Sequence, residues 1–303
     1  MAWQQLHIQC EKSDADLTET LMLEAQALSI SLDDAGDQPL FEPLPGESPL
    51  WDEVILTGLF DTHINLEDLG QHIAQSVTAS RVWVSQVDDK DWEREWMKNY
   101  HPIECANGLW IVPKWLTPPN PDALNVIMDP GLAFGTGYHA TTRLCIDWLT
   151  TQDLTDKVVI DYGCGSGILG VVALLLGAKQ VYAVDIDPQA ILATNQNATR
   201  NHVGDNIQAF LPEAFQAFCN NNPDILPADM ITANILAKPL IGLAPYFATL
   251  LKPQGKIVLA GLIENQVTEV KTAYQPYFAM TDEFTFTSQE DKHWHRLSGS
   301  RLA

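Results

Sequence analysis

Apolar and polar positions alternate in blocks along the second half of the chain. Short apolar runs, each typical of a buried strand, occupy residues 158–162, 181–185, 207–211, 228–235 and 256–262. Between them, residues 167–177, 188–202, 237–251 and 264–274 have the spacing of amphipathic helices. Strands that alternate with helices predict an α/β fold with a doubly wound, Rossmann-like parallel sheet.

The end of the chain departs from this alternation. Residues 282–288 and 293–298 read as two successive strands with only a short polar turn between them. We therefore expect the sheet to end in an antiparallel hairpin. Such an edge favours the methyltransferase variant of the doubly wound fold over the dehydrogenase variant.

The front of the chain has a different order of elements. Strand patterns at 3–10, 28–32, 51–59 and 81–87 enclose helical patterns at 14–27 and 65–78. The order βαββαβ predicts a small ferredoxin-like α+β domain over residues 1–87.

Residues 88–125 fit neither pattern, and we interpret them as a linker. A short helix with aromatic residues is expected at 90–98, strand-like pieces near 109–112 and 124–128, and a proline-rich break at 117–121. The catalytic domain is then expected to cover residues 126–303.

Composition places the chain among ordinary globular proteins. Its 303 residues are 46% hydrophobic, and the mean hydropathy is -0.06. No apolar run approaches the roughly 20 residues that span a bilayer, so we expect no membrane association. The five cysteines are scattered without paired spacing, which favours reduced thiols and a cytoplasmic location over disulfides or a metal site.

The charge is strongly negative and unevenly distributed. The formal net charge is -22, and residues 1–100 hold 20 of the 39 acidic residues but only 5 of the 17 basic ones. Such a surface repels nucleic-acid phosphates, so direct nucleic-acid binding is not expected. It would attract a basic partner, although the same acidity could serve solubility alone.

The motif with the clearest chemistry is Asp161-Tyr-Gly163-Cys-Gly165-Ser-Gly167, between a predicted strand and a predicted helix. Glycines allow a sharp turn and a close approach of backbone to ligand, and a helix start is expected to offer free N–H groups. Asp185 follows the next strand, 22 positions after Gly163, where it can accept hydrogen bonds from ribose hydroxyls. The motif predicts an adenosine cofactor.

The spacing of the glycines favours one cofactor. A dinucleotide fingerprint places its third glycine three residues after the second, whereas here Gly163, Gly165 and Gly167 alternate. Asp161 would repel a pyrophosphate but attract an ammonium group. Both features favour S-adenosylmethionine, which has an ammonium group and no phosphate. The alternative is a glycine turn that only packs a helix against a strand.

Two further segments could complete a site. Asn234 ends the fourth predicted strand, where its amide could orient an amine nucleophile, although such an Asn is more commonly a turn former or cap. Residues 128–142, rich in glycine and polar residues, could form a flap that includes Phe134 and Gly135, with Thr142 opening the next helix. His139 is either a base or a loop or cap residue, and no metal-ligand spacing is present.

Several motifs occur together and in order. They are the flap Asp129–Thr142, the glycine turn, Val184-Asp-Ile-Asp-Pro188, Ala233-Asn-Ile-Leu236, and near the front Phe41-Glu-Pro-Leu-Pro-Gly46 and Asp91-Trp-Glu-Arg-Glu-Trp96. Over essentially its whole length the chain resembles the PrmA family, the methyltransferases of the eleventh protein of the large ribosomal subunit.

The resemblance implies a class I S-adenosylmethionine-dependent methyltransferase preceded by a small substrate-recognition domain. It implies methylation of lysine ε-amines and the N-terminal α-amine of a basic ribosomal protein. We expect the chain to be a monomer. The resemblance implies that Thr142, Gly163, Asp185 and Asn234 contact the cofactor. We also expect contacts from Asp161 and Gly165 of the loop and from Phe134 and Gly135 of the flap. Asn234 is the expected catalytic residue.

The chain departs from the family pattern at two flap positions. Tyr138 and Ala140 stand where Thr and Pro are expected, which puts the rigidity of the flap in question. Alternatives to the family's activity are methylation of another protein side chain and binding of S-adenosylmethionine without catalysis. Methylation of a nucleic-acid base is disfavoured by the charge and by the Ile-Leu that follows Asn234.

Overall fold

The computed structural model describes residues 3–36, 50–87, 96–131, 133–223, 225–287 and 293–303. The chain divides into two compact units, Met1–Lys98 and Asn99–Ala303. Met1–Lys98 is the first unit and Asn99–Ala303 is the second.

The first unit is a four-stranded antiparallel sheet with two helices. Its elements are β1 (Trp3–Glu11), α1 (Ala15–Glu24), β2 (Ser29–Asp34), β3 (Glu53–Asp61), α2 (Leu66–Ala74) and β4 (Ala79–Val87). The strand order is β2-β3-β1-β4, and every neighbouring pair is antiparallel. The predicted ferredoxin-like βαββαβ arrangement is confirmed.

The core of the first unit follows from the two-residue period of its strands. Leu6, Ile8 and Cys10 alternate along β1 with half-buried residues, and all three are fully buried. They pack with residues of α1 and α2, which places both helices on one face of the sheet.

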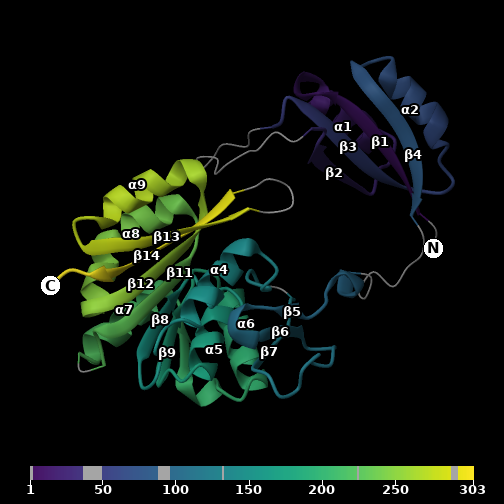
Figure 1. Ribbon diagram of the computed structural model, residues 1–303. Helices are drawn as coiled ribbons and strands as arrows, with labels where there is room; N and C mark the ends of the chain where they lie inside the picture. Colours follow the sequence, from purple (N-terminus) through teal and green to yellow (C-terminus); the bar gives the residue numbers. More distant parts are fainter. Residues whose placement is uncertain (1–2, 37–49, 88–95, 132, 224, 288–292) are drawn as a thin grey trace. The chain divides into compact units, whose positions relative to one another are not determined.

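The second unit is built on a seven-stranded sheet (Figure 1). Its strands are β8 (Val158–Tyr162), β9 (Gln180–Val184), β10 (Ile207–Phe210), β11 (Ala228–Asn234), β12 (Leu251–Ile263), β13 (Phe278–Thr287) and β14 (His293–Arg301). The order is β10-β9-β8-β11-β12-β14-β13, with parallel pairing as far as β12 and antiparallel pairing beyond it. The predicted doubly wound sheet with a terminal hairpin is confirmed.

Helices cover both faces of this sheet. They are α4 (Ala140–Leu149), α5 (Ile168–Leu175), α6 (Pro188–Arg200), α7 (Pro212–Asn221), α8 (Ala237–Leu250) and α9 (Glu264–Tyr274). One core contains residues of α4, α5 and α6, and the other contains residues of α7, α8 and α9 (Figure 1). Consecutive strand residues alternate between the two cores, as Val159 and Ile160 do, because side chains of a strand point to opposite faces.

Helix α7 was missed by the sequence analysis. Its start carries Pro212 in the first turn, and the buried Phe215 is followed at helical spacing by Phe218 and Cys219, which pack on the same core. The helix follows the short strand β10 directly, so its first residues read as a turn.

The predicted linker 88–125 does not behave as one segment. Residues 99–125 group with the second unit, and their strands β5 (Ile103–Glu104) and β6 (Trp110–Pro113) join β7 (Asn125–Met128) in a small sheet. A 3₁₀ helix occupies Trp96–Asn99, whereas the rest of the expected aromatic helix and the motif at residues 41–46 lie outside the described residues. Among the residues placed in the structure, no helix is long and apolar enough to cross a membrane.

Candidate functional site

The glycine loop, residues 163–167, joins β8 to α5 at the carboxyl edge of the sheet. Gly163, Gly165 and Gly167 have φ values of +75°, +52° and +78°, which side-chain-bearing residues rarely adopt. Space is also lacking: a Cβ on Gly163 would lie 2.1 Å from Ile235 Cγ2, and one on Gly165 would lie 2.4 Å from the Phe134 carbonyl oxygen. The alternating glycines are therefore required by backbone geometry and by close packing.

The N–H groups of this loop point into the protein. Gly163 N and Cys164 N donate to Val184 O, and Gly165 N donates to Asp185 Oδ2 at 2.8 Å. Ser166 N donates to Phe134 O at 2.7 Å, and Gly167 N donates to Cys164 O. All five N–H groups of residues 163–167 are therefore already used. At the start of α5, where free N–H groups were expected, Gly170 N donates to Asp161 Oδ2, whereas Ile168 N and Leu169 N donate to no other described residue.

The carbonyl groups of the loop leave one acceptor available. Cys164 O, Gly165 O, Ser166 O and Gly167 O each accept a hydrogen bond from this chain. Gly163 O accepts none within the described residues. Residues 163–167 thus have a spare acceptor and no spare donor, which suits a cationic group better than a phosphate.

Asp161 lies beneath the loop. It is 1% exposed, Oδ2 accepts from Gly170 N at 2.9 Å, and Oδ1 accepts from Thr232 Oγ1 at 2.9 Å. Burial raises the pKa of this carboxyl to about 6, against the opposing effect of these two hydrogen bonds. Asp161 therefore joins β8, β11 and α5, and its contact with the cofactor remains a prediction.

Asp185 follows β9 and faces the loop. Its Oδ2 accepts from Gly165 N, and its Oδ1 accepts from Asp187 N at 3.0 Å. A carboxylate has about four acceptor positions, so both oxygens can accept further hydrogen bonds from a ligand diol. Asp187 in turn caps α6 by accepting from Gln189 N, which fixes the turn that carries Asp185.

The flap packs directly on the glycine loop. Besides the bond from Ser166 N to Phe134 O, Ser166 Oγ donates to Gly135 O at 2.5 Å. Gly135 has a φ of +95°. The Phe134 side chain is 97% exposed, so its backbone belongs to the joint with the loop while its ring is available to cover a ligand.

The two departures from the family pattern are accommodated in the flap. Tyr138 Oη donates to His101 O and accepts from His101 N, and its ring packs edge-on against Tyr100 at 4.7 Å. Ala140 is the first residue of α4, a position where Ala is compatible with helix. Tyr138 therefore anchors the flap to the start of the second unit by its own side chain.

Thr142 and Asn234 meet at the carboxyl end of β11. Asn234 Nδ2 donates to Thr142 Oγ1 at 3.3 Å, and Asn234 Oδ1 has no hydrogen-bond partner in the described part of the chain. We expected Thr142 to open the helix, but it is the third residue of α4. That role belongs to His139, which caps the helix by accepting from Thr141 N.

His139 is held in place by its neighbours. Its ring packs edge-on against Trp294 at 4.5 Å, and burial of the ring, followed by the nearby Arg143, lowers its pKa. Of the two alternatives left open for this residue, the structure supports the helix cap. Within the described residues, no group of three or more His, Cys, Asp or Glu side chains could hold a metal ion.

Two sets of residues near the site were not identified from the sequence. Ile186 and Leu211, which follow β9 and β10, are 83% and 39% exposed, so the rim beside Asp185 is apolar. Beneath the flap and loop, the buried side chains of Thr194 and Asn197 on α6 donate to Gly165 O and Ser166 O. The available signal was an apolar residue one or two positions after each strand, and Thr and Asn at helical spacing in α6.

The site fits S-adenosylmethionine. Asp185 can hold the ribose diol, the apolar rim of Ile186 and Leu211 can pack on the adenine, and Gly163 O can accept from the ammonium group. The dinucleotide alternative is disfavoured because a pyrophosphate would find no loop N–H group to bind.

Comparison with known proteins agrees with this interpretation. The model of the family described as ribosomal protein L11 methyltransferase (PrmA) matches residues 2–301. The chain belongs to the PrmA family. A relative from Psychrobacter cryohalolentis with that name is 72% identical over 99% of both chains, and one from Acinetobacter baylyi is 50% identical over 99% of both. The crystal structure of a ribosomal protein L11 methylase from Lactobacillus delbrueckii subsp. bulgaricus has 31% identity and a TM-score of 0.56, and the match covers 67% of this chain and all of that one.

Replacement of Gly165 by alanine tests the contact between flap and loop. The new Cβ would lie 2.4 Å from Phe134 O at a φ of +52°, so the flap must move away from the loop. We expect the Kd for S-adenosylmethionine, measured by calorimetry, to rise by at least about tenfold, or ~1.4 kcal/mol. Gly242→Ala is the matched control, since no atom other than those of its chain neighbours and its own helix backbone lies within 4 Å of its Cβ position. Equal affinities of the two variants would contradict the proposed joint.

The pH dependence of stability tests the burial of Asp161. The folded pKa of about 6 lies above the ordinary value of 3.8, so the folded state holds the proton more tightly. The free energy of unfolding should therefore fall as the pH rises from about 4 to about 6, by up to about 3 kcal/mol from this group.

Asp161→Asn keeps the shape and an acceptor but removes the titration. The stability of this variant relative to the wild type, measured by urea titration at each pH, should rise between about pH 4 and pH 6. A difference that stays constant over this range would show that Asp161 is not destabilised by burial.

Proposed function

We propose that this chain transfers methyl groups from S-adenosylmethionine to lysine ε-amines and the N-terminal α-amine of ribosomal protein L11. Family membership supports the reaction class and the substrate, because the relatives carry the name ribosomal protein L11 methyltransferase. The observation in the structure that carries the proposal is the polarity of the glycine loop: five donors turned inward and one acceptor, Gly163 O, available for a cationic ligand.

S-adenosylmethionine supplies, when bound, a methyl group made electrophilic by its sulfonium. The residues of this chain hold the two reactants in line, which contributes much of the rate of a displacement. The residues for holding the cofactor are Gly163, Asp185 and the apolar rim, with Thr142 and Asn234 at the end where the amine enters.

Asn234 is the proposed catalytic residue because its Oδ1 is an uncharged acceptor beside the site. It can accept one N–H of a neutral amine and so fix the direction of the nitrogen lone pair. Its other amide atom is held by Thr142 Oγ1, which sets the orientation of the amide plane. A free lysine amine has a pKa of about 10.4, so burial near positive charge must favour its neutral form.

The negative charge of the chain supports the proposal that its substrate is a basic protein. A net charge of -22 attracts a lysine-rich protein and disfavours direct contact with nucleic acid. We further propose that the chain acts as a monomer in the cytoplasm, where ribosomal proteins are made. Its five free cysteines are consistent with a reducing compartment.

A direct assay tests the proposed activity. The purified chain is incubated with isotope-labelled S-adenosylmethionine and purified L11, and the product is analysed by mass spectrometry after proteolysis. We expect mass increments of one or more methyl groups on lysines and on the N-terminal residue. Unmodified L11, with labelled cofactor bound by the protein, would instead indicate a binding protein without this activity.

Asn234→Ala tests the role of the amide. We expect kcat/KM for the protein substrate to fall by about 100-fold, or ~2.7 kcal/mol, since the amine loses its orienting acceptor. Asn206→Ala is the control, because the exposed Asn206 side chain donates only to Lys179 O, away from the site. A value of kcat/KM near wild type, with unchanged affinity for the cofactor, would show that Asn234 does not orient the amine.

A further inference from the structure

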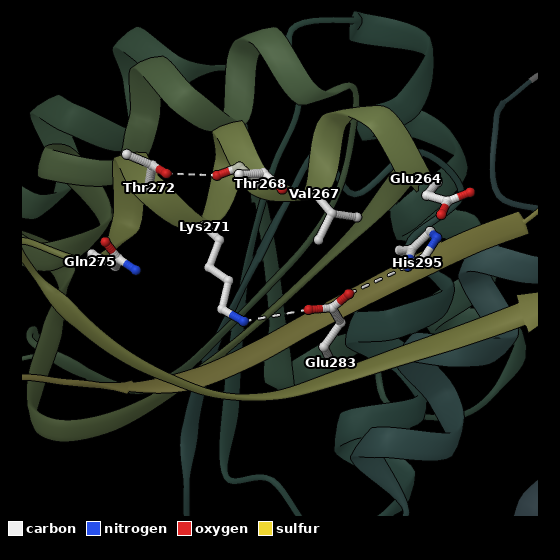
Figure 2. A pocket seen from close by; sticks show the side chains of 8 residues that line it. All are labelled: Glu264, Val267, Thr268, Lys271, Thr272, Gln275, Glu283 and His295. Atoms are coloured by element: carbon white, nitrogen blue, oxygen red, sulfur yellow. Dashed lines mark hydrogen bonds and ion pairs between the residues drawn. The ribbon is translucent and has the colours of Figure 1, made fainter.

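A polar groove lies between α9 and the hairpin of β13 and β14 (Figure 2). Helix α9 packs on the face of the sheet opposite α4. Its volume is about 460 Å³. The lining residues are Glu264, Val267, Thr268, Lys271, Thr272, Gln275, Glu283 and His295. None of these residues has a part in the cofactor site described above.

His295 forms part of the groove and is 5% exposed. Along β14 the side chains alternate: Trp294 packs on His139 of the flap, whereas Leu297, on the same face as His295, belongs to the core under α8 and α9. The strand therefore presents Trp294 to the cofactor side and His295 to the groove.

One nitrogen of His295 is satisfied and the other is not. Nδ1 lies 3.1 Å from Thr285 Oγ1 and 3.9 Å from Glu283 Oε1. Nε2 is buried and has no hydrogen-bond partner among the described residues. With the proton on Nδ1, directed toward these oxygens, Nε2 carries a lone pair and requires a donor.

The charges around the groove specify what kind of donor it would accept. Glu264 and His295 lie at one end of the groove in Figure 2, and Gln275 lies at the other. Lys271 is directed toward Glu283, with 3.4 Å between Nζ and Oε2. The carboxylate of Glu264 makes no ion pair with another described residue. A carboxylate and an imidazole acceptor at one end, with a second carboxylate nearby, favour a cationic group with several N–H donors.

One end of the groove, at Glu264, lies at the same edge of the sheet as Asn234, although the Asn234 side chain contacts Thr142 of α4 on the other face. β11 and β12 are parallel neighbours, and Asn234 is paired with Ala260. Glu264 is the first residue of α9, directly after β12, so it also lies at the carboxyl edge. A polypeptide with one amine at Asn234 could thus reach the groove by passing over the carboxyl end of β12 to the other face of the sheet.

We propose that Glu264 and His295 bind a second basic side chain, a lysine or an arginine, of the protein substrate whose amine is being methylated. This exosite would hold the substrate without contacting the reacting atoms. It rests on the proposed function, because it requires a basic protein substrate.

The test is steady-state kinetics of the full chain with L11 as substrate at saturating S-adenosylmethionine. We expect Glu264→Gln to raise the KM for L11 about threefold to tenfold, as for the loss of a partly exposed charged contact, and to leave kcat unchanged. Glu264→Asp should retain most of the affinity. His295→Gln should raise KM in the same way, and its affinity for S-adenosylmethionine reports whether the variant is folded.

Glu269→Gln is the matched control, because Glu269 is an exposed residue of α9 outside the groove lining and the charge change is identical. A KM for Glu264→Gln equal to that of Glu269→Gln would overturn the exosite, as would a loss confined to kcat. If the wild type transfers no methyl group to L11, the proposed function fails and the exosite fails with it. An active wild type with an unchanged KM in Glu264→Gln refutes the exosite alone.

Discussion

The site depends on the contact between two backbone segments that are distant in sequence. Phe134 O and Gly135 O of the flap accept from the N–H and the hydroxyl of Ser166, and this approach is possible only because Gly165 has no side chain. The contact uses one of the five loop N–H groups, and it places the exposed Phe134 beside the loop. The position of the flap therefore depends on a glycine at 165.

A buried polar framework holds this contact from below. Asp161 joins the strands to α5, and Thr194 and Asn197 of α6 bind the loop carbonyls. Asn201 extends the framework to β7, with its amide bonded to both Ile127 N and Ile127 O at 2.7 Å. Buried polar groups of this kind are costly to leave unpaired, so they fix one arrangement of loop, flap and helix.

Much of the fold could be predicted from the sequence because apolar runs of strand length, bounded by turns, mark buried strands. Strand β8 was predicted at its observed bounds, and the terminal hairpin was recognised from two neighbouring strand patterns. The alternating glycines likewise indicated the cofactor. The inward direction of the loop N–H groups and the burial of Asp161 could not be predicted, because both depend on partners such as Phe134 and Thr232 that only the folded chain brings near. Helix α7 was missed because it follows the short strand β10 directly, so that Pro212 and the residues after it read as a turn.

The most direct test of this account is a crystal structure of the chain with S-adenosylhomocysteine. We predict that the ribose hydroxyls donate to Asp185 and that the adenine packs against Ile186 and Leu211. The ligand ammonium should donate to Gly163 O, and the bond from Ser166 N to Phe134 O should be intact. A ligand bound elsewhere, or a flap detached from Ser166 with the loop N–H groups turned toward the ligand, would contradict it.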